Sequence, residues 1–217
     1  MVERDKNMIS YCITVYKEIY ELKTLLQLLK QVKQSGDEIV VIQTYRHEYE
    51  KTAIEFLDIQ KICKEYSDTY DTFHFQNNFA DMKNHMSNQA NVNNKYIINF
   101  DADETMPYDM LVMLRNFLEQ CDIDVLYLPR VNIVDNITDE DIRKWSWTVN
   151  QYGWINWPDY QSRIYKNNKT IRWSGAVHEQ LTGYNTRSLI EADGSVYIYH
   201  RKNIDKQRKQ NDFYNSI

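Results

Sequence analysis

The chain has 217 residues, 42% of them hydrophobic and 13% aromatic, which excludes a globally disordered protein. Its 31 acidic and 26 basic residues give a net charge of −5, which disfavours a protein that binds nucleic-acid backbones non-specifically. The three cysteines lack CxxC spacing, so a disulfide framework and a zinc knuckle are disfavoured and a reducing compartment is indicated. No apolar run approaches the ~20 residues of a membrane-spanning helix, and no signal peptide is evident. We therefore expect a cytoplasmic protein without a membrane span.

The first 120 residues alternate between apolar runs typical of strands and segments with helical spacing of apolar residues. We expect strands at 8–15, 38–42, 72–75 and 95–100, and helices at 18–33, 48–66, 79–90 and 107–120. This alternation predicts a parallel sheet with right-handed crossovers. In such a sheet, ligands bind beyond the carboxyl ends of the strands.

The second half has a different pattern. We expect a longer strand at 124–134 that Pro129 interrupts, and a mobile polar loop or lid at 135–152. Short strands are predicted at 162–165, 170–173 and 195–199, and a charged helix at 203–214.

Two aspartates one residue apart follow the fourth predicted strand. Asp101 and Asp103 can converge on a hard divalent cation, Mg²⁺ or Mn²⁺, that keeps positions open for substrate phosphates. Their place at a strand end favours a functional role. The same residues also fit a solvated turn before the helix that Pro107 starts, so both interpretations remain open at this stage.

Two further segments carry residue types suited to catalysis. In 173–179, the His178 imidazole beside the Glu179 carboxylate suits a third metal ligand and a general base, or a surface pair on a strand. In 154–163, tryptophans beside Asp159 and Arg163 suit sugar stacking and hydroxyl or phosphate contacts, or an aromatic cluster at the edge of the core.

Other basic residues carry a weaker signal. The cation of Lys83 could point into the same crevice or lie on the surface. We expect His47, His74 and His85 to be structural. His200 could touch a phosphate, but we expect it to lie at a solvated basic end of the chain.

Taken in order, five short stretches resemble a family 2 glycosyltransferase with the GT-A fold, and among these the lipopolysaccharide-core glucosyltransferases most. The stretches lie at 13–18, 78–84, 100–104, 158–163 and 177–179. The resemblance implies an α/β fold with a Rossmann-like, mostly parallel sheet flanked by helices and a smaller mixed β region in the second half. It implies one catalytic domain at 1–200, divided into a nucleotide-sugar half at 1–120 and an acceptor half at 121–200, and a charged C-terminal helix at 201–217.

The same resemblance assigns roles to individual residues. It implies that the nucleotide-sugar donor is bound by Thr14, Tyr16, Glu18, Gln43, Lys83, Asn84, Asp101, Ala102 and Arg163. It implies that Asp101, Asp103 and His178 hold Mn²⁺ or Mg²⁺, with Asp103 as the principal ligand. Glu179 is the first candidate for the catalytic base and Asp159 the second. Gln43 stands near the position where the family usually has an acidic residue, and its amide can still hydrogen-bond a pyrimidine edge.

The implied reaction is a single displacement with inversion, in which the metal and Lys83 stabilise the departing nucleoside diphosphate. We expect a UDP-sugar donor. The acceptor hydroxyl is open between a glycan, a lipid-linked saccharide, a protein side chain and a hydroxylated nucleobase, so a nucleic-acid acceptor is not excluded.

Two alternatives remain on sequence grounds. Residues 101–105 also fit the DxDxT signature of haloacid-dehalogenase-like phosphatases, with Asp101 as nucleophile and Asp103 as acid/base. That signature normally follows the first strand of its fold, whereas four strand–helix units are predicted here. The second alternative is a glycan- or nucleotide-binding module without turnover, whose aromatic residues serve binding alone.

Overall fold

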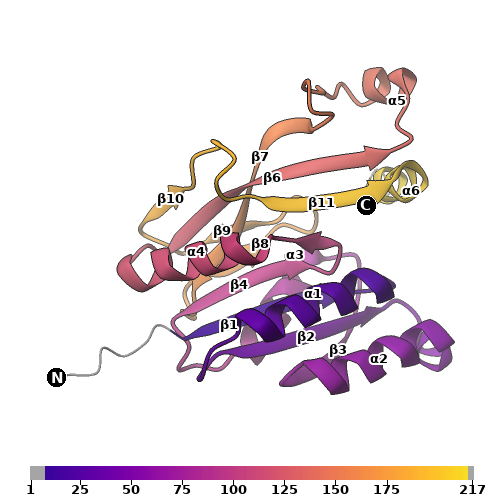
Figure 1. Cartoon of the computed structure of the whole chain (residues 1–217). Helices are drawn as coiled ribbons and strands as arrows, with labels where there is room; N and C mark the ends of the chain where they lie inside the picture. Colours follow the sequence, from indigo (N-terminus) through magenta and orange to yellow (C-terminus); the bar gives the residue numbers. More distant parts are fainter. Residues whose placement is uncertain (1–7, 215–217) are drawn as a thin grey trace.

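The structure is a computed structural model that describes residues 8–214, in which a nine-stranded sheet is flanked by helices (Figure 1). The first half alternates as predicted. Its elements are β1 (Ile9–Val15), α1 (Ile19–Val32), β2 (Glu38–Tyr45), the short 3₁₀ helix η1 (Glu48–Thr52), α2 (Ile54–Tyr66), β3 (Thr69–His74), α3 (Phe79–Gln89), β4 (Tyr96–Asp101), β5 (Glu104–Thr105) and α4 (Tyr108–Gln120).

The second half contributes mixed β structure and two helices. Its elements are β6 (Val125–Asp135), α5 (Asp139–Lys144), β7 (Ile155–Lys166), β8 (Arg172–Ser174), β9 (Gln180–Thr182), β10 (Arg187–Leu189), β11 (Ile198–Asn203) and α6 (Ile204–Tyr214). The strand order of the main sheet is β3-β2-β1-β4-β7-β6-β11-β5, with β10 added beside β6. Strands β1 to β4 are parallel, and β7 is antiparallel to both of its neighbours.

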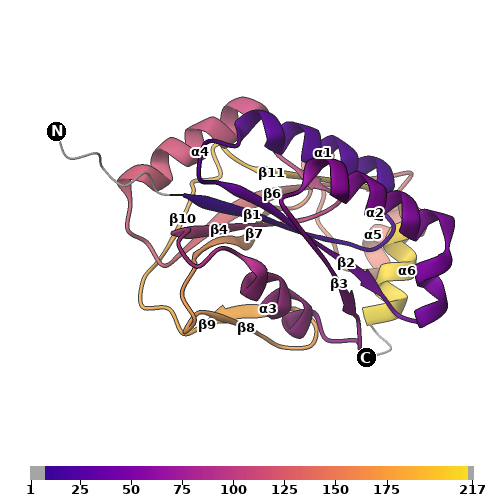
Figure 2. The ribbon, with the colours of Figure 1, turned by 90° about the horizontal axis from the view of Figure 1, so that it is seen from below.

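Helices and a small hairpin cover the two faces of the sheet (Figure 2). Helices α1, α2 and α4 lie on one face, where the leucines of α1 pack against β1 and β4 in the larger core cluster. Helix α3 and the β8–β9 hairpin lie on the other face, where Met86, Trp173 and Leu181 form a second cluster. The central strands are therefore buried on both faces, which is why they appear in the sequence as continuous apolar runs.

Several predicted boundaries in the second half are wrong. Pro129 does not interrupt β6, because it pairs with Tyr160 of β7 and the strand continues to Asp135. Strand β7 begins at Ile155, well before the predicted 162–165. The predicted loop at 135–152 contains α5, which Thr138 caps in a reciprocal capping box with Asp141. Strands β5, β9 and β10 were not predicted.

The ends of the chain and its thiols complete the fold. The predicted terminal helix begins at Ile204 directly after β11, and the last part of the predicted 201–217 segment, 215–217, lies outside the described residues. The thiols of Cys12, Cys63 and Cys121 form no disulfide. Within residues 8–214, no helix combines the length and apolar character needed to traverse a bilayer.

Candidate functional site

A cavity of about 720 Å³ lies beyond the carboxyl ends of β1 and β4, where the predicted topology places a ligand crevice. Most of the predicted site residues line it, namely Thr14, Tyr16, Glu18, Lys83, Asp101, Ala102, Asp103, Asp159, Arg163, His178 and Glu179. The structure adds residues that the sequence did not single out as site residues, among them Arg46, Arg130, Asn132, His200, Lys202 and Lys206. Segments separated by almost 200 residues thus meet at one cavity.

The strand register brings Asp101 to this cavity. Strand β4 pairs in parallel with β1, and Asp101 lies opposite Thr14. The Thr14 hydroxyl donates a hydrogen bond to Asp101 Oδ1 at 3.2 Å, and the Ala102 amide donates to the Thr14 carbonyl at 3.0 Å. The chain then turns through Asp103 into β5, so both aspartates leave the sheet at the same edge.

Glu104 lies behind the two aspartates and holds two arginines. Its side chain is buried, and its carboxylate accepts from Arg163 at 2.6 Å and from Arg130 at 2.8 Å. Arg163 also donates to Asp101 at 2.5 Å. Burial alone would raise the pKa of Asp101, but the positive charges of Arg163 and Lys83 outweigh it and lower that pKa. Asp101 is therefore an anion held in place by a buried arginine.

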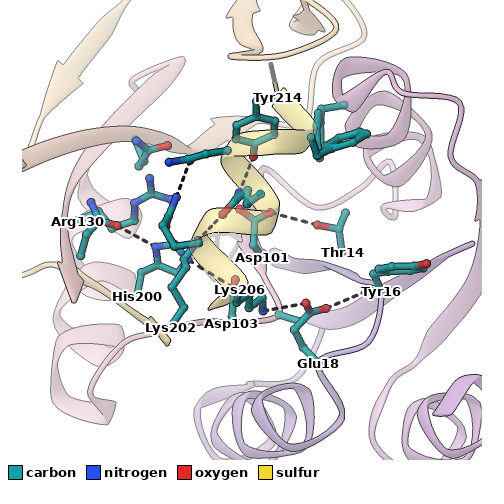
Figure 3. Close-up of a pocket in the computed structure, with 18 of the residues that line it drawn as sticks. Thr14, Tyr16, Glu18, Asp101, Asp103, Arg130, His200, Lys202, Lys206 and Tyr214 are labelled. Atoms are coloured by element: carbon teal, nitrogen blue, oxygen red, sulfur yellow. Dashed lines mark hydrogen bonds and ion pairs between the residues drawn. The ribbon is translucent and has the colours of Figure 1, made fainter. Parts of the chain in front are cut away.

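Asp103 faces the C-terminal part of the chain (Figure 3). Its Oδ2 lies 3.0 Å from Lys206 Nζ and 3.5 Å from His200 Nε2. Burial opposes ionisation of Asp103, yet His200 and Lys206 lower its pKa well below the ordinary value. Burial lowers the pKa of His200, whose other ring nitrogen contacts the side-chain oxygen of Asn132 at 2.8 Å. His200 is thus a buried imidazole beside an aspartate, and the expectation of a solvated basic end was wrong.

The two candidate bases differ in their surroundings. Asp159 accepts hydrogen bonds from Arg130, Asn132 and Gln161, and these partners lower its pKa although burial opposes the shift. Glu179 forms an ion pair with Lys83 and lines the cavity. An aspartate bound by so many donors is a weak proton acceptor, so the geometry favours Glu179.

The loop that carries Glu179 has unusual backbone geometry. Gly175 has a φ of 102° and His178 a φ of 53°, and a positive φ is uncommon for a residue with a side chain. Such conformations persist where the surrounding structure imposes them, often at functional sites. Both His178 and Glu179 line the cavity.

Lys83 lines the cavity, which is the first of the two alternatives left open by the sequence. Its side chain is 4% exposed, its ammonium pairs with Glu179, and Nζ lies 4.5 Å from the centroid of the Trp173 ring. The cation does reach the crevice, but it is engaged with a carboxylate and an aromatic face.

Two residues predicted to bind the nucleotide do not line the cavity. Gln43 is fully buried, its amide donates to the Phe56 carbonyl at 3.1 Å, and its oxygen accepts from the Tyr70 hydroxyl. Asn84 exchanges two hydrogen bonds of 2.9 Å with the backbone of Trp173. Both side chains satisfy buried backbone or hydroxyl groups, so their predicted contact with a nucleotide is not supported.

Aromatic residues and an arginine line the end of the cavity that lies beyond β1, β2 and β3. The Arg46 guanidinium lies 4.1 Å from the Phe213 ring centroid and 5.4 Å from that of Phe75. Tyr16 and Phe79 line the same cavity. Flat apolar faces beside a guanidinium are suited to stacking a planar heterocycle.

The predicted metal ligands lie on one cavity but do not form a cluster. Within residues 8–214, the structure brings together no group of three or more His, Cys, Asp or Glu side chains able to hold a metal ion. Asp101 and Asp103 nevertheless present carboxylate oxygens at one edge, and His200 lies beside Asp103. Carboxylates with an imidazole are a donor set that suits Mn²⁺. His200 Nε2 lies 3.5 Å from Asp103 Oδ2, whereas the His178 ring packs beside the Tyr214 ring.

Comparisons with known proteins identify solved structures of similar fold. No protein-family model matches the sequence, and no curated protein matches it by sequence. The structure of S. aureus TarS 1-349 has a TM-score of 0.56 at 14% identity, covering 89% of this chain and 60% of that one. The complex of TarS 1-349 with UDP-GlcNAc has a TM-score of 0.54 at 16% identity, covering 90% and 58%. The chain thus spans about three fifths of the TarS fragment it matches.

The likeness to TarS confirms the predicted fold class. The chain has the GT-A fold, with a large mostly parallel sheet flanked by helices. The complex of TarS 1-349 with UDP has a TM-score of 0.54 at 14% identity, so the same fold likeness extends to both liganded forms of that protein.

Proposed function

We propose that this protein is a glycosyltransferase that moves a sugar from a nucleotide-diphosphate donor, a UDP-sugar, to an acceptor hydroxyl. One observation carries the proposal: Asp101 and Asp103 share a cavity with several cationic side chains and with Glu179. Carboxylates for a divalent ion, cations for a diphosphate and a base for a hydroxyl are the groups that this reaction needs. The GT-A fold and the UDP-GlcNAc and UDP complexes of TarS support the choice of donor.

We expect Mn²⁺ or Mg²⁺ at Asp103 and Asp101. His200 joins the proposed ligands because its Nε2 lies 3.5 Å from Asp103 Oδ2, while His178, which also lines the cavity, remains a candidate. A bound divalent ion would neutralise negative charge on the donor diphosphate. Arg163 fixes Asp101, and Asn132 orients the His200 ring, so both proposed ligands have supporting contacts.

The residues of the chain define the proposed chemistry. Glu179 accepts the proton of the acceptor hydroxyl, whose oxygen attacks the anomeric carbon with inversion. Lys83 orients Glu179 through its ion pair under the Trp173 ring. Asp159 orients Arg130 and Gln161 at the cavity wall rather than acting as the base. The phosphatase alternative is not favoured, because its nucleophile would be Asp101, which is held by Arg163 in a GT-A fold.

A panel of nucleotide sugars, with and without Mn²⁺, tests the proposal. A donor that binds raises the melting temperature by mass action, and turnover is measured as release of the nucleoside diphosphate. In Asp103→Asn we expect turnover to fall by about 10²-fold or more, since preorganised charge at the leaving group is lost. Asp58→Asn, an exposed aspartate on α2, is the matched control and keeps full activity.

The outcomes separate the candidate functions. Unchanged turnover in Asp103→Asn would remove the metal role. Hydrolysis of a simple phosphate ester without nucleotide-sugar binding would instead favour the phosphatase, and donor binding with neither transfer nor hydrolysis would favour a binding module.

A further inference from the structure

Helix α6 contributes several polar side chains to one wall of the cavity. The residues that line the cavity from this helix include Lys206, Gln207, Gln210, Asn211 and Tyr214. Their spacing of three to four residues places them on one side of an α-helix. Figure 3 shows Lys206 and Tyr214 directed toward the two aspartates from this helix. The opposite side of α6 is polar as well, with Asp205 and Asp212 exposed, so the helix presents polar side chains both to solvent and to the cavity.

The helix is fixed by contacts that do not involve the Lys206 side chain. Arg208 pairs with Asp141 of α5 at 2.9 Å, and the Asn203 side chain accepts from the first turn of the helix at 2.8 Å. Near its end, the Phe213 ring packs against the Arg46 guanidinium. Because the helix is held at its start, middle and end by other residues, the position of Lys206 is not explained by a need to dock the helix.

Lys206 bridges two carboxylates from distant parts of the chain. Its Nζ lies 3.0 Å from Asp103 Oδ2 and 2.9 Å from Glu18 Oε1. Glu18 is itself oriented, because its other oxygen accepts from the amides of Tyr16 and Lys17. The ammonium therefore lies between the loop after β1 and the aspartate pair after β4, which is where the proposed donor diphosphate would lie.

The other cations near the proposed diphosphate site are paired with carboxylates, including Lys83, which the family resemblance assigned to the diphosphate. Lys83 is buried and paired with Glu179, and Arg163 and Arg130 are paired with Glu104. The Lys206 side chain is 38% exposed, against 4% for Lys83 and Arg163 and 17% for Arg130, so its ammonium is the most accessible of the four. Of these cations, Lys206 is the one that can exchange a carboxylate partner for a phosphate at little cost.

We propose that Lys206 is the residue that binds the donor diphosphate, and that Asp103 and Glu18 hold its ammonium in place until the donor arrives. The inference rests on the proposed function and adds a leaving-group residue to it. Asp103 would hold a divalent ion in competition with the ammonium, and Lys206, released from that carboxylate, would donate to the diphosphate oxygens.

The proposed step conserves charge and atoms. The bond between the anomeric carbon and the β-phosphate oxygen breaks, and its electron pair stays on the nucleoside diphosphate. The bond between the acceptor oxygen and the anomeric carbon forms, and the acceptor proton goes to Glu179. Lys206 keeps its proton and donates a hydrogen bond to the departing diphosphate, which stabilises the charge that develops there.

The test uses MnCl₂ and UDP as probes of binding, apart from turnover. Mn²⁺ affinity without nucleotide is measured by electron paramagnetic resonance, and UDP affinity at saturating Mn²⁺ by calorimetry. In Lys206→Met we expect Mn²⁺ to bind about tenfold more tightly, because a competing cation is gone, and UDP to bind about tenfold more weakly, because a charge-assisted hydrogen bond is lost. Lys206→Arg keeps UDP binding within a few-fold of the wild type.

The controls distinguish this inference from a structural effect. Lys64→Met, which removes an exposed cation of α2, changes neither affinity. A structural role for Lys206 would weaken both ligands together, and that result, or unchanged UDP binding in Lys206→Met, would overturn the inference. If the wild-type protein binds neither Mn²⁺ nor UDP, the proposed function itself fails; if it binds both and Lys206→Met behaves identically, this inference alone fails.

Discussion

Glu104 belongs to the acidic segment 101–104, and we predict that its role there is to stabilise the structure. Its side chain is 0% exposed, its carboxylate accepts from Arg130 and Arg163, and it accepts a third hydrogen bond from the Asp101 amide at 3.1 Å. The substitution Glu104→Gln preserves the shape of the side chain and removes its charge. The buried guanidinium of Arg163 and the partly buried guanidinium of Arg130 then lose a carboxylate that both contact.

The expected cost follows from the partners that remain. Removing one partner of a buried ion pair typically costs about 3–5 kcal/mol. Arg163 keeps Asp101 and Arg130 keeps Asp159, so we expect the lower end of that range, about 3 kcal/mol. For a domain of this size, each kcal/mol lowers the melting temperature by about 2–4 °C, which gives a fall of about 6–12 °C.

Urea denaturation and thermal melting measure this cost. Glu65→Gln, an exposed carboxylate of α2, is the control and is expected to change stability by less than about 0.5 kcal/mol. A fall in melting temperature of less than about 2 °C in Glu104→Gln would refute the reasoning that Glu104 fixes the two arginines.

Three further predictions follow from the site. Asn84→Ala removes two hydrogen bonds to the Trp173 backbone and is expected to cost about 1–3 kcal/mol in urea denaturation, with UDP affinity unchanged; a selective loss of UDP binding would restore the nucleotide-binding role. Glu179→Gln is expected to lower turnover by about 10²–10⁴-fold with UDP affinity retained, and a larger loss of turnover in Asp159→Asn would reverse the assignment of the base. The pKa values of Asp101, Asp103 and Asp159 are lowered in the folded protein, so their stabilising effect is complete above the unfolded aspartate pKa of about 3.9 and is lost as the pH falls below it. Urea midpoints between pH 7 and pH 2.5 measure that loss, and midpoints that stay constant below pH 4 would contradict it.

The parallel half of the fold is predictable because its strands are buried on both faces of the sheet and therefore appear in the sequence as apolar runs. Strands such as β2 and β4 appear as short continuous apolar runs, and the helices between them show apolar spacing of three and four. The place of Asp101 and Asp103 follows from this topology alone, since both come directly after a buried parallel strand. Most of the predicted site residues therefore line the cavity.

The amide residues show where sequence patterns mislead. Gln43 lies at the end of β2 and Asn84 on α3, both close to the cavity, but their side chains hydrogen-bond buried groups of Phe56, Tyr70 and Trp173. Whether a polar side chain points into the cavity or into the protein depends on which group it hydrogen-bonds. Those partners are up to 89 residues away in sequence and leave no local signal.

The C-terminal residues of the site were missed for a different reason. His200 and Lys202 alternate on β11, and Lys206 follows at the start of a helix, so the chain shows a basic stretch that also fits a solvated end. The deciding contact is the pairing of β11 with β6 and β5, which places His200 beside Asn132 and near Asp103. The spacing of His200 and Lys202 was the available indication, because residues two apart on a strand lie on the same face.

The three acidic residues of segment 101–104 divide into two roles that sequence spacing cannot separate. Asp101 and Glu104 are both bound by Arg163, so their charges are already compensated by a buried cation. Asp103 is compensated by Lys206, which is more exposed and lies on a terminal helix. A ligand that brings its own charge can displace a partly exposed ammonium far more readily than a buried guanidinium. We therefore propose that Asp103 is the residue whose partner is exchanged when a ligand binds, while Glu104 maintains the geometry and Asp101 offers a carboxylate that Arg163 holds in place.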